Sequence, residues 1–306
     1  MRKIFIQTLI ELAKLDKRIM LLTGDLGYTV IEPFKKAFPD RFFNVGVAEQ
    51  NLVGIATGLA AQGLIPFVYS IATFMTLRPY EFIRNGPVLH NLPVRIVGVG
   101  GGFEYGKSGK THHAIDDIGV MRLQRGMNIF VPADSQQTKT ILEKTWNISG
   151  PNYYRIGKHE QVLKSLQGKF SIGKLQIIKP GADIAVFVSG SLGFLAEQVS
   201  QKMEVTGVSV LLAVVASISP PPKDLKRVIS NFSLIATIES HQTIGGLGSL
   251  VAETIADQGL KTRLLRFGIK QPLDAIVGTE EYLLDKYHLN EKYILNQLKL
   301  AWRKKT

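Results

Sequence analysis

Short apolar runs alternate with amphipathic stretches along the first half of the chain, a pattern typical of parallel strands covered by helices. The apolar runs predict strands at Ile19–Leu22, Phe42–Asn44, Ile65–Val68, Val94–Val99 and Asn128–Val131. Helical spacing of apolar residues predicts helices near the start of the chain, over Ala48–Ala61 and over Ser135–Trp146. Asp134, which directly precedes the last of these, is a good N-cap residue.

The same alternation returns after a polar, glycine-punctuated stretch. Strands are predicted at Ile184–Val188, Val208–Val214 and Leu234–Ile238, with helices near Leu195–Met203 and Ser249–Ala256. We therefore predict an α/β protein with two open α/β domains, over 1–160 and 181–306, joined by a linker over 161–180. A chain of 306 residues fits this division, since domains average roughly 150 residues.

Composition narrows the chemistry. The chain has no cysteine, which excludes cysteine-ligated zinc, iron–sulfur clusters, a thiol nucleophile and disulfides. Its net charge of +12 favours anionic partners, although the cations are spread along the chain and a generally basic surface explains them equally. No nucleic-acid-binding module accompanies them, so nucleic-acid binding is not expected.

The hydropathy pattern does not predict a membrane protein. No run reaches the roughly 18 apolar residues of a membrane span. Glu11 and Lys14 interrupt any signal-peptide core near the N-terminus. We expect a cytoplasmic protein.

Residues Gly101–Ser108 match the phosphate-loop pattern G-x-x-x-x-G-K-[ST] after a predicted strand. A phosphate-binding loop must open a helix, yet the following residues, with Gly109 among them, have the composition of a continued loop. A nucleotide triphosphatase therefore stays a remote alternative. Gly245–Gly248 resembles part of a nucleotide-binding turn, but it lacks a third glycine and is better explained as a structural turn, with His241 nearby in an interface loop.

His112 and His113 lie close to Asp116 and Asp117, which together offer metal-capable groups within six residues. Adjacent residues of an extended loop point in opposite directions, and the two histidines are therefore poorly placed to share one ion. We predict no metal ligands in this chain. A histidine that faces a cleft as a proton or hydrogen-bond donor is the better interpretation.

Glu49 is placed at the start of a helix rich in small residues, among them Gly54 and Gly58, against which another backbone can pack closely. A carboxylate there commonly serves as a cap or interacts with the helix dipole. On position alone, a structural role and a functional role both remain open.

Three segments together resemble the thiamine-diphosphate transketolase family. They are Val45–Asn51, Pro66–Phe74 and Gly109–His113, which occur in the family's order and spacing. Gly24-Asp25-Leu26 and Pro132-Ala133-Asp134 fit as well, and the similarity runs through essentially the whole chain. The resemblance implies a pyrimidine-binding domain followed by the family's C-terminal domain.

The family's diphosphate-binding motif, G-D-G followed by a distant Asn, has no counterpart here, since Asp25 lies in Gly-Asp-Leu-Gly. The resemblance therefore implies the C-terminal subunit of a split transketolase, inactive alone. A separate N-terminal subunit would hold the diphosphate of thiamine diphosphate and its Mg²⁺, in an expected α2β2 heterotetramer. The implied reaction moves a two-carbon ketol unit from a ketose phosphate donor to an aldose acceptor.

The resemblance also implies roles for individual residues. Glu49 matches the glutamate that hydrogen-bonds N1′ of the aminopyrimidine and promotes its imino tautomer, and Phe74 matches the aromatic that packs on that ring. Tyr80 follows at helical spacing and is a weaker candidate for the same wall. His112 matches the histidine that reaches the substrate oxygen and stabilises the developing alkoxide.

Four further residues are candidates for contacts with substrate or cofactor. His113 neighbours His112, and Arg155 falls near the family arginine that binds a sugar phosphate. By the same resemblance, Asp25 is a cofactor candidate and Thr29 a substrate candidate.

Two lysines depart from the family pattern. Lys107 and Lys110 replace the family's usual residues before Thr-His, which suggests either two solvent-exposed side chains or recognition of an unusually anionic acceptor. Three other functions stay open as less favoured alternatives: a deoxyxylulose-phosphate-synthase-like reaction, an α-ketoacid-dehydrogenase-β-like reaction, and a non-catalytic scaffold that kept the fold.

Overall fold

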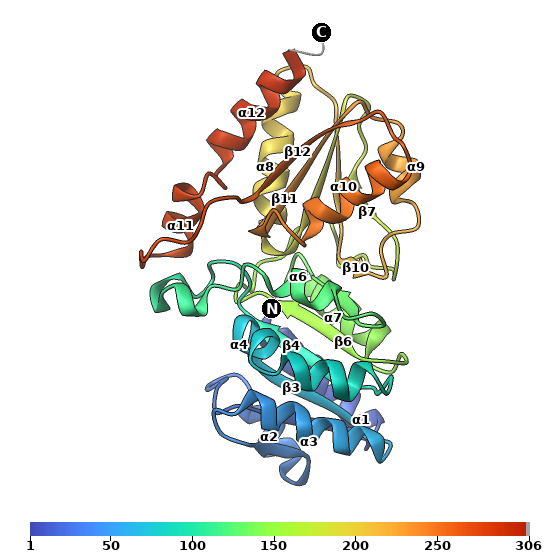
Figure 1. Ribbon diagram of the computed structural model, residues 1–306, viewed down its shortest axis with the longest axis vertical. Coiled ribbons are helices and arrows are strands. Elements are labelled where there is room, and N and C mark those ends of the chain that lie inside the picture. The colour runs from blue at the N-terminus through green and yellow to red at the C-terminus, as the bar shows by residue number, and fades with distance from the viewer. Residues whose placement is uncertain (304–306) are drawn as a thin grey trace.

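The computed structural model describes residues 1–303 and shows two α/β halves stacked along the long axis of the molecule (Figure 1). Each half is built on its own sheet, with seven strands in one and five in the other. The predicted fold class, two open α/β domains, is confirmed.

The first sheet has the strand order β10-β5-β6-β4-β3-β1-β2, and every pairing except β10–β5 is parallel. Its strands are β1 (Ile19–Thr23), β2 (Phe42–Asn44), β3 (Ile65–Ile71), β4 (Arg95–Val99), β5 (Asn128–Phe130), β6 (Asn152–Ile156) and β10 (Ser217–Ser219). Strands β1, β4 and β6 are buried along their whole length, as expected for a parallel sheet covered on both faces.

Helices cover this sheet, and two of them confirm the predicted starts. The helices are α1 (Arg2–Leu15), α2 (Glu32–Ala37), α3 (Glu49–Ala61), α4 (Ala72–Leu77), α5 (Tyr80–Ile83), α6 (Asp117–Arg122) and α7 (Ser135–Thr145). Asp134 caps α7 as expected, because its Oδ1 accepts a hydrogen bond from the backbone N–H of Gln137 at 2.6 Å. A π-helical turn, Arg84–Val88, extends α5.

The second sheet has the order β12-β11-β8-β9-β7, parallel except for β7 against β9. Its strands are β7 (Gln176–Lys179), β8 (Ile184–Ser189), β9 (Val210–Val214), β11 (Leu234–Gln242) and β12 (Arg263–Ile269). The helices are α8 (Gly193–Glu204), α9 (Leu225–Ile229), α10 (Leu247–Asp257), α11 (Glu280–Lys286) and α12 (Glu291–Arg303). No helix within residues 1–303 is long and apolar enough to cross a membrane.

The strands missed by the hydropathy pattern carry polar residues or lie at sheet edges. In β6, Asn152 and Arg155 are buried and hydrogen-bonded, so the strand has no apolar run to reveal it. β12 is an edge strand with several exposed positions. β7, at the other edge, lies inside the stretch predicted as a linker.

The two halves share structure. β10 belongs to the second half of the sequence, yet it pairs with β5 and extends the first sheet. The N-terminal amine lies near the boundary between the halves (Figure 1), where it donates a hydrogen bond to the carbonyl oxygen of His159. The second half is thus anchored directly to the edge of the first sheet.

Candidate active site

The segments that follow β2, β3 and β4 carry Glu49, Phe74 and His112. Glu49 is the first residue of α3, Phe74 lies in α4, and His112 lies in the loop between β4 and α6. Parallel strands end at the same edge of a sheet, and loops at that edge form the binding crevice of open α/β folds. This topology brings together residues far apart in the sequence.

Glu49 is 1% exposed and has two side-chain partners. Ser70 Oγ donates to its Oε1 at 2.9 Å, and Arg78 Nη1 donates to its Oε2 at 2.8 Å. A buried carboxylate needs such partners, because burial removes the hydration that stabilises its charge.

Phe74 contacts both the histidine and the arginine. Its ring meets the His112 imidazole edge-on, with centroids 4.9 Å apart and planes at 67°. The Arg78 guanidinium lies over the same ring, its Cζ 3.9 Å from the centroid. His112 Nδ1 is 3.0 Å from Thr111 Oγ1. We call Glu49, Ser70, Phe74, Arg78 and His112 the Glu49 cluster.

Sequence reasoning missed Ser70 and Arg78. Both were visible in principle, because Ser70 lies within the Pro66–Phe74 motif and Arg78 is four residues after Phe74, on the same helical face. The apolar pattern does not reveal them, since their role lies in a contact with Glu49, which is 21 and 29 residues away.

Asp25 and Thr29 lie in the loop after β1 and both have left-handed backbones, with φ of 58° and 66°. Asp25 exchanges hydrogen bonds with Asn44: its N–H donates to Asn44 Oδ1 at 3.0 Å, and Asn44 Nδ2 donates to its Oδ1 at 2.9 Å. Hydrogen bonds from Asn44 and the Tyr28 hydroxyl lower the pKa of Asp25. Non-glycine residues with positive φ are costly and cluster at functional sites. The cofactor role of Asp25 and the substrate role of Thr29 stay predictions.

Three other candidates lie around the cluster. Tyr80 begins α5 and packs partly buried against the apolar core. Lys107 and Lys110 are exposed on 3₁₀ turns of the loop that carries His112, and neither forms an ion pair with a described residue. Their contact with substrate stays a prediction.

The two histidines face different surroundings, as the extended-loop argument requires. His113 is buried and packs edge-on against Phe103, with ring centroids 5.1 Å apart, and neither of its ring nitrogens has a hydrogen-bond partner among the described residues. Burial lowers the pKa of His113. Its placement does not support contact with a substrate that His112 binds.

Arg155 is buried between the two halves, and its guanidinium is engaged by the protein. Nε and Nη2 donate to the Asp117 carboxylate at 2.8 and 3.1 Å. Nη2 also donates to the carbonyl oxygens of Ala114 and Ser240, at 2.7 and 2.9 Å. These contacts give Arg155 a structural role, and its expected contact with a sugar phosphate gains no support from them.

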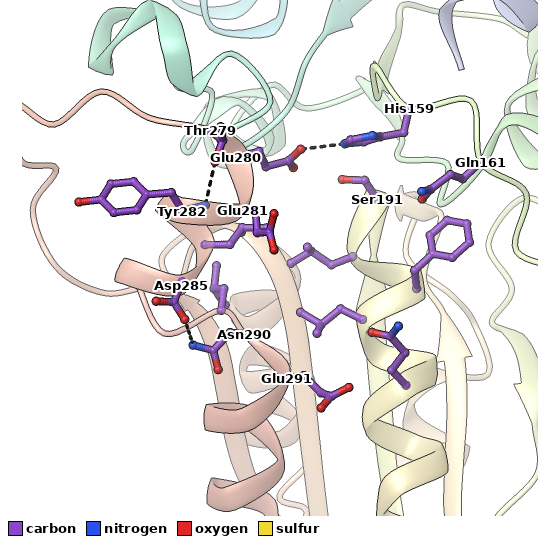
Figure 2. A pocket seen from close by; sticks show the side chains of 16 residues that line it. His159, Gln161, Ser191, Thr279, Glu280, Glu281, Tyr282, Asp285, Asn290 and Glu291 are labelled. Carbon is purple, nitrogen blue, oxygen red and sulfur yellow. Dashed lines mark hydrogen bonds and ion pairs between the residues drawn. The ribbon is translucent and has the colours of Figure 1, made fainter.

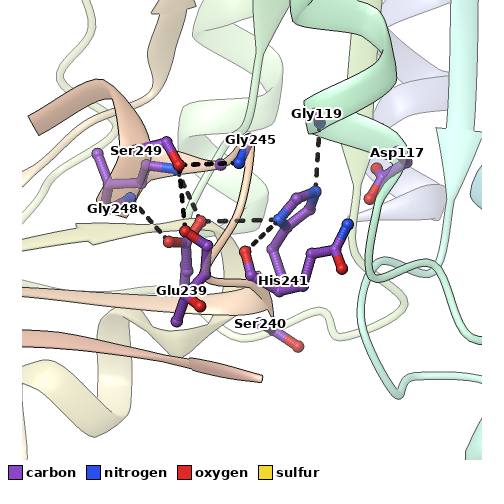
Figure 3. A network of polar contacts seen from close by, with 12 residues as sticks. Asp117, Gly119, Glu239, Ser240, His241, Gly245, Gly248 and Ser249 are labelled. Carbon is purple, nitrogen blue, oxygen red and sulfur yellow. Dashed lines mark hydrogen bonds and ion pairs between the residues drawn. The ribbon is translucent and has the colours of Figure 1, made fainter. Parts of the chain in front are cut away.

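Figure 3 shows that β11 of the second half continues this network. His241 Nε2 accepts a hydrogen bond from Gly119 N–H at 3.2 Å, and its Nδ1 is 2.7 Å from the Gln242 carbonyl oxygen. Glu239 accepts from the N–H groups of Leu247 and Gly248, both at 2.7 Å. We call Asp117, Arg155, Glu239 and His241 the interdomain network.

Burial shifts both titratable side chains contributed by β11. It lowers the pKa of His241 to about 4 and raises the pKa of Glu239 to about 7. The turn at Gly245–Gly248 opens α10, and its helix N–H groups are taken by Glu239, as the structural interpretation of the turn predicts.

The glycine-rich loop at Gly101–Ser108 also serves the contact between the halves. No α-helix begins there; two 3₁₀ turns follow, and the next α-helix starts at Asp117. Gly102 has φ of 61°, and a Cβ atom at this position would lie 1.7 Å from Ser240 Oγ. Close packing against β11 therefore accounts for a glycine here without any nucleotide phosphate.

A separate groove of about 750 Å³ lies between α8, α11 and the segment containing His159 (Figure 2). At its edge His159 Nε2 is 2.7 Å from Glu280 Oε2, and this contact raises the pKa of His159. Glu104 lies close to both, and burial raises its pKa to about 7. The hydropathy pattern gave no sign of this group.

Comparison with known sequences and structures decides the family. A family model described as "Transketolase, pyrimidine binding domain" matches residues 1–162, and one described as "Transketolase, C-terminal domain" matches residues 173–292. The chain belongs to the transketolase family. The predicted resemblance is confirmed over both halves of the molecule.

Several transketolase relatives are separate chains of similar length. A "Putative transketolase C-terminal section" from Methanocaldococcus jannaschii is 35% identical over 97% of this chain and 95% of its own length. One of the two subunits of an apulose-4-phosphate transketolase from Phocaeicola vulgatus is 33% identical over 96% of this chain and 94% of its own length. A solved "Split gene transketolase, inactive beta4 tetramer" has a TM-score of 0.88 at 32% identity, covering 99% of this chain and 98% of its own.

The deoxyxylulose-phosphate synthase alternative is more distant. A 1-deoxy-D-xylulose-5-phosphate synthase from Methylacidiphilum infernorum is 30% identical over 87% of this chain, and the match spans only 43% of that protein. The relatives of matching length are named as transketolase chains, which favours the transketolase reaction over the synthase reaction.

Proposed function

We propose that this chain is the C-terminal subunit of a thiamine-diphosphate-dependent transketolase. It moves a two-carbon ketol unit from a ketose phosphate to an aldose acceptor, at a site completed by a separate N-terminal subunit. The observation that carries the proposal is the Glu49 cluster, in which a buried carboxylate, an aromatic face and an imidazole are joined by direct contacts at the carboxyl edge of the sheet.

The cluster fits the pyrimidine half of the cofactor. An aminopyrimidine is planar and carries N–H donors, so it suits a carboxylate beside an aromatic face. The Arg78 guanidinium, which is also planar and N–H-bearing, contacts both groups, so the space between them accepts such a group. When bound, the cofactor supplies the carbon nucleophile and the electron sink.

The chain's own side chains supply binding and proton control. Glu49 holds a proton at the pyrimidine ring nitrogen, and Ser70 fixes the orientation of its carboxylate. Phe74 packs on the ring face. His112 donates a hydrogen bond to the substrate oxygen where negative charge develops.

A partner subunit supplies the diphosphate site and its Mg²⁺. Support comes from relatives named as subunits and from the split-gene relative described as inactive in its β4 form. The outer face of α3 offers a docking surface, since Gly54, Ile55, Gly58 and Ala61 are all exposed at helical spacing. An α2β2 heterotetramer is the expected assembly, and a cytoplasmic location remains a prediction from the sequence.

The substrates are proposed to be phosphorylated or otherwise anionic sugars. Lys107 and Lys110 extend from the loop that carries His112, and neither is neutralised by an ion pair among the described residues. The relative named for apulose-4-phosphate is consistent with an anionic sugar.

The test is a ketol-transfer assay on the chain assembled with its N-terminal subunit, with a matched pair of variants. Glu49→Gln removes the buried carboxylate, and Glu11→Gln removes an exposed carboxylate on α1. We expect Glu49→Gln to abolish turnover while assembly, followed by size-exclusion chromatography, is kept, and Glu11→Gln to behave as wild type. Turnover that survives Glu49→Gln would contradict the proposal.

A further inference from the structure

Arg78 is joined to the same two side chains that the proposed function assigns to the cofactor ring. Its Nη1 donates to Glu49 Oε2 at 2.8 Å, and its guanidinium carbon lies 3.9 Å from the centroid of the Phe74 ring. No other described side chain makes both contacts.

A guanidinium and an aminopyrimidine present similar chemistry to such a site. Both are flat, both stack on an aromatic face, and both donate N–H groups in their own plane to a carboxylate. The carboxylate oxygen and the ring face taken by one of them are therefore closed to the other.

From this geometry we infer that Arg78 is an internal placeholder for the pyrimidine ring. It occupies the site while the cofactor is absent, and it leaves when the cofactor binds. The inference rests on the proposed function, because it takes the Glu49 cluster to be the pyrimidine site.

The placeholder explains how the cofactor-free chain tolerates Glu49. The carboxylate is 1% exposed, and apart from Arg78 its side-chain partner is the neutral hydroxyl of Ser70. A buried carboxylate without a counter-charge is costly, so a paired guanidinium stabilises the folded chain.

Arg78 is also free to leave. Its side chain is 39% exposed, in contrast to the carboxylate that it pairs with, and it lies at the C-cap of the short helix α4, next to Pro79. Rotation about its side-chain bonds moves the guanidinium into solvent without displacing the backbone.

Cofactor binding then includes a displacement step. The measured affinity is lower than the intrinsic affinity by the fraction of molecules in which Arg78 has already left, as in any pre-equilibrium between closed and open sites. Removal of the guanidinium should increase the measured affinity and, in the same variant, destabilise the cofactor-free chain.

The experiment compares Arg78→Met with Arg84→Met. Arg84 is exposed in the adjoining π-helical turn, and no side-chain contact among the described residues joins it to the Glu49 cluster, so its variant controls for the lost charge. Calorimetry gives the Kd of magnesium thiamine diphosphate for the complex with the N-terminal subunit, and thermal unfolding gives the Tm of this chain alone.

We expect Arg78→Met to lower Kd about tenfold, the effect of a site closed in about nine molecules of ten, and to lower the Tm of the cofactor-free chain. Arg84→Met should change neither. Arg78→Lys keeps the charge without the planar group, and its Kd should lie between those of wild type and Arg78→Met. An unchanged or higher Kd for both Arg78 variants would overturn the placeholder.

Failure of the placeholder and failure of the proposed function give different results. If the complex binds the cofactor and Glu49→Gln abolishes binding, but Arg78→Met binds no more tightly, only the placeholder is wrong. If no variant of the assembled complex binds the cofactor, the assignment of the Glu49 cluster is wrong, and the placeholder with it.

Discussion

The Glu49 cluster and the interdomain network use the same residue types but differ in how their partners are arranged. Each contains a buried carboxylate paired with an arginine, and each contains a histidine. Arg155 is 5% exposed and bonded on several sides, whereas Arg78 is 39% exposed and bound to Glu49 through one nitrogen. Residue type alone therefore does not mark a functional site; a buried charge whose partner can leave does.

The largest effects should separate the two regions by opposite failures. Glu49→Gln should reduce turnover by about 10²–10⁴, the range for loss of a proton-transfer group, with little loss of stability. Asp117→Asn leaves the Arg155 guanidinium buried without its counter-charge, and it should reduce the free energy of unfolding by about 3–5 kcal/mol. Turnover per assembled complex and urea unfolding measure the two effects.

Asp116→Asn is the matched control for Asp117→Asn. Asp116 precedes Asp117, forms no ion pair with a described residue and should tolerate the change. The comparison between the regions fails if Asp117→Asn is as stable as wild type, or if Glu49→Gln is as unstable as Asp117→Asn.

The pH dependence of stability sharpens the account of the interdomain network. The pKa of His241 is lowered by burial to about 4, so its contribution to stability is lost as the pH falls from about 6.5 towards 4. The pKa of Glu239 is raised by burial to about 7, so its contribution is fully present below about 4.5 and lost as the pH rises through 7. On acidification the two contributions oppose each other.

Variants should separate these contributions. His241→Gln keeps a hydrogen-bond acceptor and removes the imidazole, so acid should stabilise this variant relative to wild type. Glu239→Gln should be destabilised by acid relative to wild type. Since each pKa lies about 2.5 from its ordinary value, each difference in the free energy of unfolding should reach about 3 kcal/mol. Urea unfolding at about pH 7.5 and about pH 5 checks the signs, and parallel pH slopes for both variants and wild type would refute them.

The smallest effect concerns the two lysines beside His112. Lys107→Ala and Lys110→Ala should each raise KM for an anionic acceptor about two- to fivefold, as expected for an exposed ion pair, and leave kcat nearly unchanged. Lys164→Ala, at an exposed site outside this loop, is the control. Identical kinetics with every accepted sugar would show that Lys107 and Lys110 only face solvent.

Much of the fold was predictable because buried parallel strands are apolar runs. The predicted strand at Phe42–Asn44 was found with its predicted bounds, and those at Ile19–Leu22 and Ile184–Val188 each extend by one residue. β6 was not predictable, since its buried Asn152 and Arg155 depend on partners that only the folded chain supplies. β10 was not predictable either, because a three-residue strand joins the sheet of the other half.

The site was predictable as far as single positions carry its chemistry. Glu49, Phe74 and His112 were named from the sequence, and the structure brings Phe74 into contact with His112 and places Arg78 against both Phe74 and Glu49. The sequence did not separate His112 from His113, or a substrate arginine from the interdomain Arg155. Those distinctions depend on which way a side chain points and on what already occupies its hydrogen bonds.

The most direct measurement is a calorimetric titration of magnesium thiamine diphosphate into this chain, alone and assembled with its N-terminal subunit, with ketol transfer assayed in the same samples. The account predicts cofactor binding and turnover only in the assembled complex. Turnover by the chain alone, or no cofactor binding by a demonstrably assembled complex, would contradict it.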